Sequence, residues 1–172
     1  MSKQVISMEL TEQGIAKAIA EVERYKKDIQ FKENLLRAKV AEFLRAEAQN
    51  GFNGAIVDDV IGAPRQASVT VTANPTGNPA VVIADGRDAV WVEFGAGVHH
   101  NGVAGSSPNP YGSKLGFTIG GFGKGNGAKE TWGYFEDGEL NITRGTPAKM
   151  PMANAITALC NEFPKLAREV FG

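Results

Sequence analysis

Apolar residues recur at helical spacings from about residue 12 to residue 49, and this long pattern constrains the fold more than any other feature of the chain. Thr11 is a good N-cap, and Glu12 follows it in the first turn. A single helix over this span would be roughly 55 Å long, whereas a compact domain of this size is roughly 30 Å across. Such a helix must project, bend or pack against a neighbour. The alternative is a break near Asp28, which would give a helical hairpin. The apolar positions are Ile15, Ile19, Val22, Ile29, Leu36, Val40, Phe43 and Leu44.

Short β-branched segments separated by turn residues follow the helix, and they predict an antiparallel meander over residues 55–95. Val69 and Val71 are expected to face the core. Asp85-Gly86 is a hairpin signal. The four expected strands lie near residues 55–57, 68–72, 80–84 and 89–94.

The last of these segments, AVWVEF, has the apolar and polar alternation of a strand and leads into a glycine-rich stretch. Val90, Val92 and Phe94 would face one side of the strand, and Trp91 and Glu93 the other.

A loop is predicted over residues 96–130, because glycine, serine and asparagine dominate it and can bury little apolar surface. Loops of this length are usually functional or disordered. Phe117, Ile119 and Phe122 are apolar exceptions within it. We expect Gly102 to Gly127 to be mobile in the free protein and to order on assembly, with these three side chains docking on a neighbouring molecule.

Two further strands are predicted within residues 131–143, joined at Asp137-Gly138, with Trp132 and Tyr134 on one face. Pro147 and Pro151 should keep the following corner extended and rigid. A helical C-terminus over residues 150–170 should anchor on the sheet and long helix through Met150 and Met152, with a stop or kink at Pro164. The expected fold is therefore a single α+β domain over residues 1–172.

Charge and composition exclude several classes of protein. The net charge of −1 provides no general basic field for nucleic acid or for an anionic membrane. The single Cys160 excludes an intrachain disulfide, and its place on an apolar helical stripe predicts a small core residue. The chain has neither the apolar core of a signal peptide nor a run long enough to span a membrane, so we expect a protein made in a cytoplasm with no membrane partner.

The sequence contains no set of residues that argues for catalysis. His99 and His100 are adjacent and have no third ligand at metal spacing, so they are expected to be exposed loop residues. The glycine-rich segment 120–127 lacks the Ser or Thr that a P-loop places after its lysine, here Lys124. Asp58-Asp59 is expected to be a solvated pair. The prediction is therefore no catalytic residue, metal ligand or cofactor, and a protein that is not an enzyme.

Large aromatic residues are the best candidates for a contact surface, although core packing would account equally well for Trp91, Trp132 and Tyr134. The candidate subunit-interface residues are Trp91, Glu93, Phe94, Phe117, Ile119, Phe122, Trp132, Tyr134, Arg144, Met150 and Met152.

An ordered series of short motifs resembles the head-to-tail joining proteins of long-tailed bacteriophages, the neck and tail-completion family. A charged amphipathic helix ends near EAQNGF, and the strands SVTVTANP follow. Next come VEFG at Val92 to Gly95, a histidine-bearing loop, the aromatic strand TWGYF, and TRGTPAKMPM at Thr143 to Met152. The resemblance covers almost the whole chain. It departs from the family pattern in the long loop after VEFG and in an added residue at Lys149-Met150.

This resemblance implies a structural protein of the virion, made in the cytoplasm of a host bacterium. Such proteins form an oligomeric ring, with six copies expected, between the capsid connector or stopper and the tail-tube proteins, and DNA passes through as cargo. Two other classes remain open. One is a small cytoplasmic hydrolase that would use His99, His100 and an acid such as Glu93, and the other is a module that binds a peptide at a sheet edge.

Overall fold

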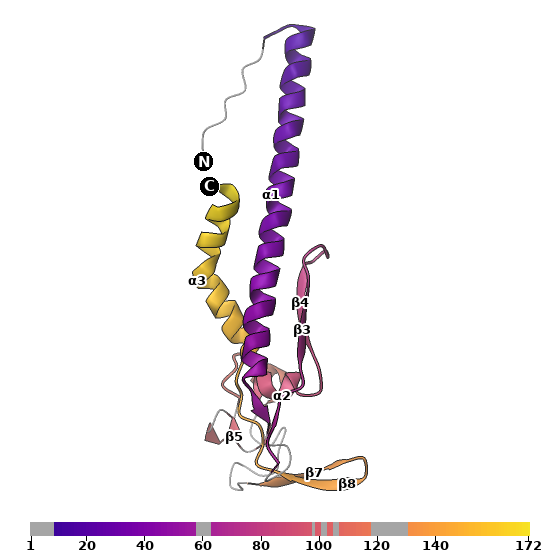
Figure 1. Ribbon diagram of the computed structural model, residues 1–172, viewed down its shortest axis with the longest axis vertical. Helices are drawn as coiled ribbons and strands as arrows, with labels where there is room; N and C mark the ends of the chain where they lie inside the picture. The colour runs from indigo at the N-terminus through magenta and orange to yellow at the C-terminus, as the bar shows by residue number, and fades with distance from the viewer. Residues whose placement is uncertain (1–8, 58–62, 98, 101–102, 105–106, 118–130) are drawn as a thin grey trace.

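A computed structural model shows an elongated α+β protein in which a long N-terminal helix packs on antiparallel strands and on a C-terminal helix (Figure 1). This confirms the expected fold class. The structure describes residues 9–57, 63–97, 99–100, 103–104, 107–117 and 131–172.

The N-terminal pattern forms one helix, α1 (Glu12–Asn53), so the alternative of a break near Asp28 is wrong. The hydroxyl of Thr11 accepts a hydrogen bond from the backbone N–H of Gly14 at 3.1 Å, as expected of an N-cap. Acid-first ion pairs support the middle of the helix, for example Asp28 with Lys32 at 3.2 Å. With 42 residues, α1 is about 63 Å long.

The C-terminal helix α3 (Pro151–Phe171) lies along the C-terminal half of α1 (Figure 1). It continues through Pro164, where the sequence predicts a stop or a kink. Proline removes one helical hydrogen bond, but its fixed φ suits a helix. Packing on both sides of this position maintains α3, since Ala155 and Val170 are both buried. The N-terminal part of α1 extends beyond the end of α3.

In the described part of the chain the strands form four separate antiparallel pairs instead of one meander. The pairs are β1 (Ile56–Val57) with β2 (Arg65–Gln66), β3 (Thr70–Asn74) with β4 (Val81–Asp85), β5 (His99–His100) with β6 (Val103–Ala104), and β7 (Trp132–Glu136) with β8 (Glu139–Thr143). β4 ends at Asp85 and the helix α2 (Ala89–Phe94) follows it, so the hairpin expected at Asp85-Gly86 is wrong. A short 3₁₀ helix, η1, spans Ser113–Leu115.

The segment AVWVEF, which alternates like a strand, is the short helix α2 (Ala89–Phe94). Its buried residues are Ala89, Val92 and Glu93, and this spacing of three and four lies on one helical face. Gly95 ends the helix with a φ of 80°, a conformation in which glycine is not strained. Six residues are too few for periodicity to separate a buried helix from a strand.

The core lies where the C-terminal end of α1 meets β3, α2 and α3. Val71 faces it as predicted, with 3% of its surface exposed, and Val69 packs at its edge. The buried core residues are Ala48, Phe52, Ala55, Val57, Val71, Val92 and Ala155. Among the helices that the structure describes, none combines the length and hydrophobicity needed to cross a membrane.

Candidate assembly surfaces

The carboxylate of Glu93 joins α2 to the start of α3. Its Oε2 accepts a hydrogen bond from the backbone N–H of Met152 at 2.8 Å, and its Oε1 accepts one from that of Ala153 at 3.1 Å. The side-chain amide of Asn109 donates a third bond at 2.9 Å. The first N–H groups of a helix have no partner within it, so Glu93 supplies the cap that the side chain of Met150 does not.

Burial raises the pKa of Glu93 above its ordinary value, and the hydrogen bonds from Met152, Ala153 and Asn109 offset only part of this effect. The carboxylate thus serves a structural purpose. Sequence reasoning named Glu93 as a contact residue and missed this role, because the partners lie 16, 59 and 60 positions away.

The backbone carbonyl of Val92 also connects α2 to the residues directly before α3. It accepts hydrogen bonds from the backbone N–H groups of Lys149 at 2.8 Å and Met150 at 3.3 Å. Met150 has a φ of 54° and a ψ of 47°, so the expectation of an extended residue before Pro151 is wrong here. The bonds to Val92 maintain this left-handed turn directly before α3.

The corner after β8 contains a glycine that no other residue could replace without movement. Gly145 has a φ of 84°, and a Cβ built on it would lie 2.1 Å from the carbonyl oxygen of Ala96. Ala96 and Thr146 exchange backbone hydrogen bonds of 2.8 and 2.9 Å. The VEFG and TRG motifs that the sequence analysis noted separately therefore lie against each other.

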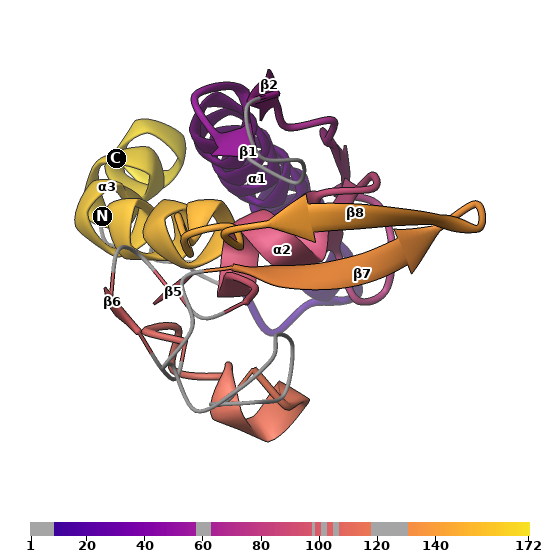
Figure 2. The same ribbon diagram turned by 90° about the horizontal axis from the view of Figure 1, so that it is seen from below.

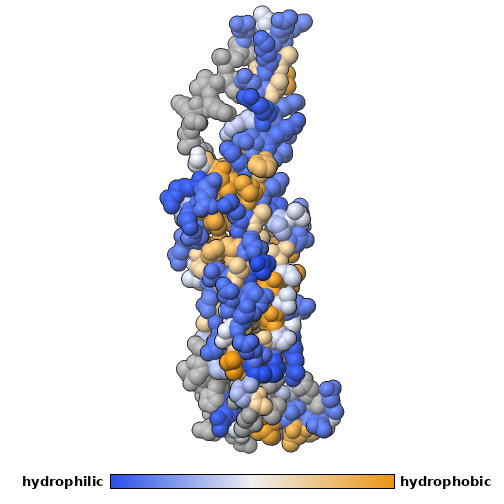
Figure 3. Space-filling model, viewed as in Figure 1, coloured by the Kyte–Doolittle hydropathy of each residue, from blue (hydrophilic) through white to orange (hydrophobic). Residues whose placement is uncertain are grey.

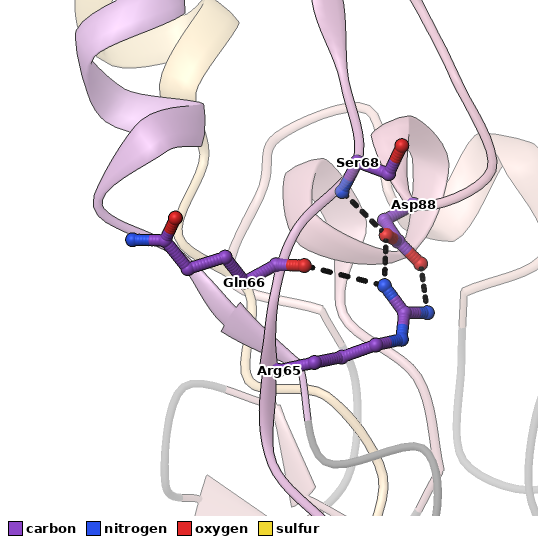
Figure 4. Close-up of polar contacts among 4 residues, drawn as sticks. All are labelled: Arg65, Gln66, Ser68 and Asp88. Atoms are coloured by element: carbon purple, nitrogen blue, oxygen red, sulfur yellow. Dashed lines mark hydrogen bonds and ion pairs between the residues drawn. The ribbon is translucent and has the colours of Figure 1, made fainter.

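An ion pair between the partly exposed Arg65 and the buried Asp88 fixes the other end of α2 (Figure 4). Asp88, which is 1% exposed, accepts two hydrogen bonds from the guanidinium of Arg65, at 2.7 and 2.9 Å, and one from the backbone N–H of Ser68 at 2.7 Å. Burial alone would raise the pKa of Asp88, but the bonds from Arg65 and Ser68 and the charges of Arg65 and Arg87 outweigh it and hold that pKa below its ordinary value.

Phe117 packs on α2 of its own chain and is 3% exposed. Its ring lies 4.8 Å from that of Phe94 and 6.0 Å from that of Trp91, measured between centroids. In this structure the side chain of Phe117 therefore has little exposed surface with which to make the docking contact on a neighbouring molecule that the sequence predicted. Ile119 and Phe122 lie outside the described residues.

Trp132 and Tyr134 share one face of the β7–β8 hairpin, as predicted, with ring centroids 5.7 Å apart. That face borders a cavity of about 360 Å³, which Trp91 and Thr146 also line. The indole N–H of Trp132 is buried and has no hydrogen-bond partner among the described residues. Figure 2 shows the hairpin extending away from the rest of the molecule. Its opposite face exposes Phe135, Leu140 and Ile142.

The N-terminal part of α1, residues 12–35, is termed the arm. It exposes several large apolar side chains, and the buried residues of α1 all lie beyond residue 40. Figure 3 shows apolar side chains among hydrophilic ones along the arm and where the end of α3 meets α1. The exposed apolar residues of the arm are Ile15, Ile19, Val22, Tyr25, Ile29, Phe31 and Leu35.

Two adjoining hollows between β4 and the first turns of α3 form what is termed the groove. Their volumes are about 240 and 510 Å³, and Met152 and Ile156 line both. Residues 37–44 of α1 close one end, and α2 with η1 closes the other. The large apolar lining residues that are most exposed are Val81, Val90, Tyr111, Leu115 and Ile156.

The residues considered for chemistry do not form a site in the described part of the chain. His99 and His100 lie in β5, and their side chains fall outside the description, as do Asp58, Asp59 and residues 120–127. Cys160 is exposed, so its expected place in the core is wrong. Arg144 is also exposed. No cluster of three His, Cys, Asp or Glu side chains suited to a metal occurs among the described residues.

No protein-family model, curated protein or solved structure matches this chain.

Proposed function

We propose that this chain is a structural protein of the bacteriophage neck, which assembles into a ring between the capsid connector or stopper and the tail tube and lets DNA pass. Its place of action would be the virion, after synthesis in the host cytoplasm. The observation that carries the proposal is the arm, whose apolar side chains no described segment of the same chain covers.

The arm favours an oligomer because an apolar stripe on a projecting helix gains free energy only when a partner covers it. Ile15, Ile19 and Val22 are each 42 to 55% exposed, although they lie on a regular helix where polar residues would serve a monomer better. The exposed face of β7–β8 offers a second apolar surface at the other end of the molecule. Two separate surfaces suit a head-to-tail ring better than a twofold dimer.

The nearly neutral charge of the chain supports a passage for DNA. Affinity for DNA grows with each phosphate that a protein neutralises, so a strongly basic channel would hold the duplex. A net charge of −1 provides little of this attraction. The structure also weakens the hydrolase alternative, because Glu93 is committed to the backbone of α3 and to Asn109.

The test is light scattering with size-exclusion chromatography on the full chain over a range of concentrations, followed by electron microscopy of the largest species. We expect discrete closed rings with an axial opening. In the double variant Ile19→Glu/Val22→Glu, two charges would interrupt the stripe, and we expect loss of the ring with an unchanged melting temperature, because both side chains are half exposed.

The matched control is Gln13→Glu/Ala20→Glu, which adds the same two charges on the opposite face of the arm. We expect this control to assemble like the parent chain. A parent chain that remains a monomer at every concentration would contradict the proposal and would favour the sheet-edge binding module.

A further inference from the structure

The groove is a built apolar site whose occupant can be argued from the same chain. Its walls come from β4 and α3, and its lining includes Leu44, Val82 and Met152, which also pack against the core. The groove is therefore continuous with a formed hydrophobic interior. Within its described lining, the charged residues are Arg37 at one end, Lys114 at the other, and the buried Glu93.

The stripe on the arm continues the helix face that α3 covers farther along α1. Apolar residues recur every seven positions from Ile15 through Val22, Ile29 and Leu36 to Phe43. A seven-residue apolar repeat is the pattern of a helix that packs along another elongated apolar surface. The covered part ends where α3 ends, near the ion pair of Lys39 with Glu169 at 2.8 Å. The apolar stripe of the arm thus extends past the part of α1 that α3 covers and stays partly exposed.

The arm cannot enter the groove of its own chain. Residues 37–44 of α1 close one end of the groove, and the straight helix carries the arm beyond that end and away from the groove (Figure 1). Bending back would require breaking α1, which is continuous over 42 residues. The arm that enters a groove must therefore come from another molecule.

We propose that the groove of each copy receives the arm of the next copy, so that the ring closes by head-to-tail exchange of helices. This inference rests on the proposed ring. Each chain supplies one amphipathic helix and one apolar groove, a recognised mode of helix binding. When the arm of one copy enters the groove of the next, and the arm of that copy enters the groove of a third, the contact is heterologous, and it closes into a ring when the rotation between copies closes. Copies with a net charge of −1 repel one another little.

Cross-linking between two variants tests the arrangement. In a Cys160→Ser background, which removes the only native thiol, Ile156→Cys marks the groove. Single cysteines at Ile15, Ile19, Val22 and Ile29 mark the arm in a parallel series. Each arm variant is mixed with the groove variant, assembled and treated with a short bis-maleimide. We expect a two-chain product in the mixture for at least one arm position, and none with either variant alone.

Ala20→Cys is the matched control, because it lies on the arm face opposite the stripe, and we expect it to give no product with Ile156→Cys. Products from arm variants alone would show arm-to-arm pairing and overturn the inference. Rings without any arm-to-groove product across the series would also overturn it, while the proposed function would stand. A chain that forms no ring would contradict both.

Discussion

At the scale of single residues, two buried carboxylates hold the ends of α2 and respond to pH in opposite directions. Asp88 has a cationic partner, and its pKa is lowered, whereas Glu93 has only neutral donors, and its pKa is raised. A lowered pKa in the folded state stabilises the fold above the ordinary pKa of the group, and a raised one favours the fold below it. Neither contribution could be predicted from the sequence, because the partners lie far along the chain.

Replacing Glu93 by glutamine should destabilise the fold by about 1–3 kcal/mol. The side-chain NH₂ of glutamine would face an N–H group that now donates to the carboxylate, so one hydrogen bond would be lost. The two carboxylate oxygens accept from Met152, Ala153 and Asn109, and glutamine offers one oxygen only. Urea unfolding followed by circular dichroism measures the loss. Glu139→Gln, at the exposed start of β8, is the control and should change little. Equal unfolding midpoints for the two variants would contradict the capping role of Glu93.

Asp88→Asn should lower stability at neutral pH, and its difference from the parent chain should shrink as the solution is acidified. The contribution of Asp88 is complete above about 3.9, the ordinary pKa of an aspartate, and is lost as the pH falls through its lower folded pKa. Glu93 titrates in both chains, so its opposite effect cancels in the comparison. Urea unfolding across a pH series provides the measurement. A difference that is constant from neutral to acid pH would show that Asp88 does not act as a paired carboxylate.

At the scale of elements, the sequence predicts best where a pattern is long or local. The 42-residue α1 and the β7–β8 hairpin with its turn at Asp137-Gly138 follow from such patterns. The segment 89–94 misleads, because the contacts of Asp88 and Glu93 with distant residues stabilise a helix there. Separate hairpins also replace the expected meander: β3 and β4 pack against α1, and no described strand pair adds a third strand.

Replacing Pro164 by alanine should stabilise the protein by about 1–3 kcal/mol, because an interior proline costs a helix roughly 3 kcal/mol. Pro164 lies within α3, and alanine would restore the missing N–H donor in the helix. A thermal melt compares it with Asn161→Ala, an exposed position of α3 where only helix propensity changes. If Pro164→Ala melts no higher than this control, the bond that proline removes contributes nothing to stability.

At the scale of the whole molecule, the apolar surfaces could be predicted in part. The long helical pattern already implies a helix that exceeds a compact domain, and its stripe is visible in the sequence. The groove could not be foreseen, because β4, α3 and η1 meet there from positions up to 75 residues apart, as Val81 and Ile156 illustrate. Of the candidate contact residues, Met152, Phe94 and the buried Glu93 line this groove, whereas Phe117 packs in the interior.

The unbroken length of α1 makes it a lever. Near the C-terminal end of α1, the side-chain amide of Gln49 donates a hydrogen bond to the carbonyl of Val69 at 3.0 Å and accepts one from the N–H of Val71 at 2.7 Å. These two bonds attach the helix to β3. The arm forms the N-terminal part of the same helix. A small tilt of α1 about its contact with β3 would displace the N-terminal end of the helix by a large distance. A force on that end would in turn act as a torque at β3. A force applied to the arm would therefore act on the β3–β4 hairpin through these two bonds.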